Sequence, residues 1–77
     1  MVMDYKKRLE ARFNEIREVT DVQKKKIEFR RLLSTIKIMS NVNEKARTKI
    51  SFASYVDRKH FLEELRVEIY KEIIGIG

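Results

Sequence analysis

The chain has 77 residues, of which 43% are apolar and 39% are charged, and it carries a net charge of +6. This length predicts one domain spanning residues 1–77 and leaves no room for a second. No stretch reaches the roughly 18 apolar residues of a membrane span. No apolar run follows the first charges, so a signal peptide is not expected either. Cysteine is absent, which excludes disulfides and thiol chemistry and favours a cytoplasmic location.

The distribution of glycine and proline predicts an all-α fold. Proline is absent and the only glycines are Gly75 and Gly77, so residues 1–74 lack the two strongest breakers of regular structure. The same scarcity excludes a glycine-rich phosphate loop. We expect a small helical bundle of three to four helices, with a helix–β-hairpin–helix (α+β) fold as the alternative.

Residues 3–19 have the clearest amphipathic pattern and predict the first helix. Thr20 and Gln23 have the spacing of a capping box, which predicts that a second helix runs from about residue 21 to 39. A single long helix with a register shift at Thr20 is the alternative. The inward residues of the two helices are predicted to be Tyr5, Leu9, Phe13, Ile16, Val19, Val22, Phe29, Leu32, Leu33, Ile36 and Met39.

Residues 40–56 are ambiguous. Asn41 or Asn43 is a suitable N-cap for a third helix, whereas residues 35–40 and 48–56 also alternate acceptably as two strands. A hairpin between those strands would lack its usual glycine, so we favour the helix. Its inward residues would be Val42, Ala46, Ile50, Ala53 and Val56.

The last predicted helix covers about residues 58–74. Asp57 is its expected N-cap and Gly75 its expected C-terminal stop. One side carries an apolar stripe that is expected to face the core. This stripe consists of Phe61, Leu62, Leu65, Ile69 and Ile73.

The last helix also carries a second apolar row, made of Val67, Tyr70 and Ile74, on the side opposite Leu65. A helix that is apolar on two sides is buried on both or docks onto another molecule. The domain itself, a second copy or a foreign protein could cover this row. Because a domain of this size is marginally stable alone, we expect a homodimer formed through the last helix, to which the terminal residues 74–77 would contribute.

The excess positive charge is confined to the middle of the chain. Residues 21–56 hold nine basic and three acidic residues, whereas the remaining residues hold nine of each. A basic segment between balanced ends favours contact with a polyanion, DNA before RNA, through residues 24–49. Phe52 and Tyr55 could stack on bases but are expected to pack in the core. The predicted contact residues are Lys24, Lys26, Arg30, Arg31, Lys37, Lys45, Arg47 and Lys49.

No catalytic or metal-binding motif is present. His60 is the only histidine and is expected on the surface of the last helix, in its first turn. Without a second histidine or a cysteine, neither a metal site nor an activated nucleophile is expected. We therefore predict a non-catalytic regulatory or accessory protein without cofactor or membrane contact, which binds nucleic acid. The alternative is a protein-binding adaptor or inhibitor that uses Val67, Tyr70 and Ile74.

Overall fold

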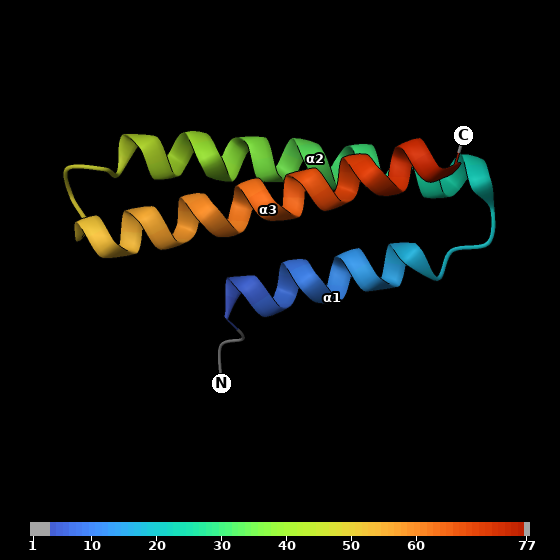
Figure 1. Cartoon of the computed structure of the whole chain (residues 1–77), viewed down its shortest axis with the longest axis horizontal. Coiled ribbons are helices and arrows are strands. Elements are labelled where there is room, and N and C mark those ends of the chain that lie inside the picture. Colours follow the sequence, from blue (N-terminus) through green and yellow to red (C-terminus); the bar gives the residue numbers. More distant parts are fainter. Residues whose placement is uncertain (1–3, 77) are drawn as a thin grey trace.

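The computed structural model describes residues 4–76, so the predicted first helical residue, Met3, and the terminal Gly77 lie outside the described part. Within residues 4–76 the chain forms three α-helices and no strand. These are α1 (Tyr5–Arg17), α2 (Val22–Lys45) and α3 (Phe52–Ile76) (Figure 1). The all-α prediction is confirmed, and the hairpin alternative is wrong.

The helices run up, down and up. Lys6 pairs with Asp57 near one end of α1, and Arg17 pairs with Glu72 near the other end, so α1 runs parallel to α3. α2 lies antiparallel to both (Figure 1). With 13 residues, against 24 in α2 and 25 in α3, α1 covers only part of the α2–α3 pair. The end of the pair near the α2–α3 turn extends beyond α1 (Figure 1).

The predicted break near residue 20 is confirmed, but the capping residue is Asp21 rather than Thr20. The Asp21 carboxylate accepts hydrogen bonds from the backbone N–H groups of Gln23 (3.0 Å) and Lys24 (3.2 Å). A carboxylate at this place satisfies free donors and also interacts favourably with the positive end of the helix dipole. The Asp21 carboxylate therefore stabilises the start of α2 both by its hydrogen bonds and by its negative charge, and the Thr20–Gln23 capping box does not form.

The separate third helix predicted within residues 40–56 is wrong. α2 continues to Lys45, the chain turns through residues 46–51, and α3 begins at Phe52. The Ser51 hydroxyl accepts a hydrogen bond from the Ser54 N–H (3.1 Å) and caps α3 in place of Asp57. Asp57 lies inside the helix, where it pairs with Lys6 at 2.6 Å.

Asn43, one of the two expected N-caps of that third helix, is instead a buried residue within α2. Its side-chain Nδ2 donates a hydrogen bond to the Tyr55 carbonyl (3.2 Å), which joins α2 to α3 close to their connecting turn. At the other end of α3, Gly75 does not stop the helix, which continues to Ile76.

The core lies where the three helices meet. Phe29, Ile16, Ile36 and Ile69 are fully buried, and the Phe13 ring lies 5.8 Å from that of Phe29. The predicted stripes of all three helices contribute to this core, as expected. The prediction is wrong for Val22 and Val42 on α2 and for Ala53 on α3, which are exposed. In the described part of the chain, no helix is both long and apolar enough to cross a membrane.

Candidate nucleic-acid interface

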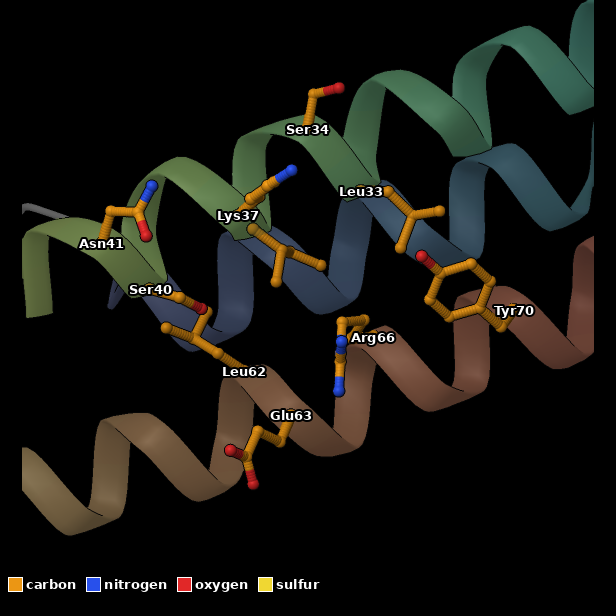
Figure 2. A pocket seen from close by; sticks show the side chains of 10 residues that line it. Leu33, Ser34, Lys37, Ser40, Asn41, Leu62, Glu63, Arg66 and Tyr70 are labelled. Atoms are coloured by element: carbon orange, nitrogen blue, oxygen red, sulfur yellow. The ribbon is translucent and has the colours of Figure 1, made fainter. Parts of the chain in front are cut away.

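A groove runs between α2 and α3 on the side away from α1. It contains a hollow of about 400 Å³, and α1 lies behind the helix pair in this view (Figure 2). Ile36 and Leu62 are buried and form its floor, and the ring of Tyr70 reaches toward Leu33 across it (Figure 2). The polar side chains of the lining are Ser34, Lys37, Ser40, Asn41, Glu63, Arg66 and Tyr70.

α2 places three of the predicted contact residues along this groove. Lys37 lines the hollow, and Arg30 and Lys26 lie about two and three helical turns nearer the N-terminus on the same side. Lys37 and Arg30 are exposed and Lys26 is half-buried. None of the three forms an ion pair with another of the described residues.

α3 adds two cations that the sequence-based prediction missed. Arg66 lines the same hollow as Lys37 (Figure 2), and Lys59 lies seven residues earlier on the same side of α3. Both belong to a helix whose net charge is slightly negative, and for that reason the prediction left them out. The sequence did contain one sign that Lys59 and Arg66 belong together, because a spacing of seven residues keeps two residues on nearly the same side of a helix.

A second hollow, of about 420 Å³, lies beside the α2–α3 turn and shares Glu63 with the first. Arg47 and Lys59 line it, and their cationic groups lie 5.6 and 5.9 Å from the centre of the Tyr55 ring. The Tyr55 hydroxyl donates a hydrogen bond to Glu44 (2.5 Å), which raises the pKa of the tyrosine above its usual value. The partner of the Glu44 carboxylate is therefore an uncharged hydroxyl and not one of the nearby cations.

The two aromatic residues next to the basic segment, Phe52 and Tyr55, differ in solvent exposure. Tyr55 is 6% exposed and packs between the helices, as expected, whereas Phe52 is 76% exposed. The prediction that Phe52 packs in the core is therefore wrong. Phe52 is the first residue of α3, at the end of the helix pair that α1 does not reach (Figure 1). Its ring lines the second hollow.

The eight predicted contact residues do not form one patch. Lys24 and Arg31 lie on a different side of α2 from Lys26, and Arg31 pairs with Glu28 (3.2 Å). The other three lie far from Lys26, at the opposite end of α2 and in the turn that follows. They are Lys45, Arg47 and Lys49.

Ion pairing is concentrated on the α1 side of the molecule. Every ion pair between helices in residues 4–76 involves α1, and these pairs are Lys6–Asp57, Arg12–Glu28 and Arg17–Glu72. The described residues of α2 and α3 form no ion pair with each other. Within residues 4–76, the cations on the groove side therefore form no ion pair with a carboxylate.

Residues 4–76 do not cover the second apolar row of α3. Val67, Tyr70 and Ile74 are 46%, 49% and 77% exposed, so the possibility that the domain folds over them is wrong for residues 4–76. Tyr70 belongs both to this row and to the lining of the groove.

The described residues contain no group of three histidine, cysteine, aspartate or glutamate side chains that could hold a metal ion. His60 is exposed, as expected, but lies in the third turn of α3 rather than the first, because the helix begins at Phe52. No protein family, curated protein or solved structure was found to match the chain.

Proposed function

We propose that this protein is a non-catalytic, cytoplasmic nucleic-acid-binding protein, with DNA as the first ligand to test. The binding surface is the groove side of the α2–α3 pair, which carries Lys26, Arg30 and Lys37 along α2 and Arg66 on α3. The observation that carries the proposal is the distribution of ion pairs within residues 4–76, where the inter-helix pairs all involve α1 and the cations of the groove remain unpaired.

Phosphate contacts would supply most of the affinity. Each basic side chain that neutralises a phosphate releases a counterion, so the binding constant falls as the salt concentration rises. The groove offers at least four such groups, for which the log–log salt slope on duplex DNA is expected near −3 to −4. Contacts of this kind position a protein on the backbone and do not read sequence.

A titration with duplex DNA, single-stranded DNA, RNA and heparin at two salt concentrations tests the proposal. Lys26→Glu combined with Arg30→Glu should weaken binding to all sequences alike and flatten the salt slope. The matched control is Lys7→Glu combined with Lys71→Glu, which makes the same change in net charge away from the groove. Absence of binding at low salt, or equal effects of the two double variants, would contradict the proposal.

Self-association is the second candidate function, and the exposure of Val67, Tyr70 and Ile74 favours it. A second copy that packs on this row would add apolar burial to a core built from only three helices. Sedimentation at micromolar concentration should then give twice the monomer mass, and Ile74→Glu should restore the monomer by placing a charge in the contact. A monomeric wild type would contradict self-association and favour the alternative, in which this chain is an adaptor or inhibitor that binds a different protein through the row.

A further inference from the structure

We infer that the ligand of this groove is a single-stranded nucleic acid whose bases stack on Phe52 and Tyr70. The inference rests on the proposed function and goes beyond it, because it assigns the strandedness of the ligand and two aromatic contact residues. Phosphate contacts alone do not distinguish a single strand from a duplex. Exposed aromatic rings do, because they stack on bases that are free of their pairing partners.

The two rings lie near opposite ends of one side of α3. Phe52 lines the hollow beside the α2–α3 turn and Tyr70 lines the hollow in the middle of the groove. Eighteen residues separate them, which corresponds to about 27 Å along the helix axis. An extended strand of several nucleotides covers such a span.

Cations occupy the interval between the rings. Lys59 and Arg66 stand between Phe52 and Tyr70 on α3, and Lys37 of α2 lines the same hollow as Arg66. The order along this side of α3 is thus Phe52, Lys59, Glu63, Arg66 and Tyr70, with one carboxylate between the two cations. Aromatic rings and cations along one surface match the two parts of a single strand, in which charged phosphates follow one another beside flat bases.

Solvent exposure of the rings supports a ligand-binding role. Phe52 is 76% exposed although it is among the most hydrophobic residues of the chain, and half of Tyr70 is also open to solvent. The third ring of this region, Tyr55, is buried, and the cationic groups of Arg47 and Lys59 lie 5.6 and 5.9 Å from its centre. It therefore serves to hold two cations in place, while Phe52 and Tyr70 remain available for bases.

The experiment compares the binding of single-stranded DNA, single-stranded RNA and duplex DNA of equal length to the full chain at several salt concentrations. The wild type should prefer the single strands. Phe52→Ala and Tyr70→Ala should each weaken single-strand binding by about fivefold to a hundredfold, and should leave the salt slope unchanged because no charge is lost. Ile38→Ala, which truncates an exposed side chain on α2 outside both hollows, is the matched control and should have no effect.

Tyr70→Phe adds a direct readout. This variant keeps the ring and should bind like the wild type. The quenching of tyrosine fluorescence that a stacked base causes should disappear with it, since the other two tyrosines are not exposed. Circular dichroism of each variant verifies that the helices are retained.

The outcomes separate the inference from the proposed function. Salt-dependent binding of single strands and duplex alike, with no loss in Phe52→Ala and Tyr70→Ala, would overturn the inference and leave the proposed function standing. Absence of binding to any nucleic acid at low salt would overturn both. If Tyr70→Ala changes the sedimentation mass and not the affinity, Tyr70 belongs to a contact between two copies and the inference is wrong.

Discussion

Lys37 of α2 and Arg66 of α3 line the same hollow, on the side of the helix pair that α1 leaves open. Neither of these two cations forms an ion pair within residues 4–76. The single carboxylate in that lining belongs to Glu63. A phosphate bound in this hollow would supply the missing counter-charge, and an anion that binds only the folded chain would stabilise it.

Arg66→Gln should weaken nucleic-acid binding and reduce the salt slope by about one, because one phosphate contact is removed. Lys71→Gln is the matched control, since it removes one positive charge from the same helix but at a residue that pairs with Glu68 and lies outside the groove. Titrations at several salt concentrations measure both slopes. Equal slopes in the two variants would place Arg66 outside the contact.

Glu63→Gln should strengthen binding by a few-fold, because it removes the carboxylate that both hollows share and that repels phosphate. Glu64→Gln makes the same change in charge at the next residue, which lines neither of these hollows, and should have a smaller effect. The measurement is the dissociation constant at low salt. A gain that is equal in the two variants would indicate a general effect of net charge.

Ile36→Ala should lower the free energy of unfolding by about 2–5 kcal/mol, because it leaves a cavity in the core. Ile38→Ala, two residues further along α2, should change it by no more than about 0.5 kcal/mol. The two side chains are 1% and 63% exposed, so the pair isolates burial from residue type. Urea unfolding followed by circular dichroism gives both values, and similar losses would contradict the assigned packing of α2.

Asp21→Ala should cost about 1 kcal/mol of stability, since the carboxylate accepts hydrogen bonds from two backbone N–H groups at the start of α2. Thr20→Ala should cost less, because Thr20 is not the capping residue. Thermal unfolding of the two variants and of Asp21→Asn, which retains a capping oxygen, measures the difference. A larger loss in Thr20→Ala would restore the capping box that the sequence predicts.

The stabilisation that Tyr5, Lys6 and Tyr55 contribute should be fully present below about pH 10 and fall above it. Burial raises the pKa of Tyr5, and hydrogen bonds to Asp57 and Glu44 raise the pKa of Lys6 and of Tyr55. The folded chain thus holds these protons more tightly than the unfolded chain, and this contribution is lost as the pH rises through the folded-state pKa values. Urea unfolding on either side of pH 10 tests the fall, which should be shallower in Tyr55→Phe.

The sequence by itself determined the helical class, the break near residue 20 and most of the core. These features depend on local quantities, namely the absence of breakers and the spacing of apolar residues such as Leu9 and Ile16 or Leu62 and Ile69. The ends of helices were less certain. Asp21 replaced Thr20, and Ser51 replaced Asp57, because several residues that can cap lie within a few positions and small differences in energy choose among them.

The candidate site depended on the tertiary structure. Charge counting along the chain found Lys26, Arg30 and Lys37 but missed Arg66, because the sequence does not show which side of α3 faces α2. It also placed Phe52 in the core, because its hydrophobicity is a local property whereas its exposure depends on how far the shorter α1 reaches. Burial and the convergence of charges arise from contacts between distant residues, and only the packing of the three helices decides them.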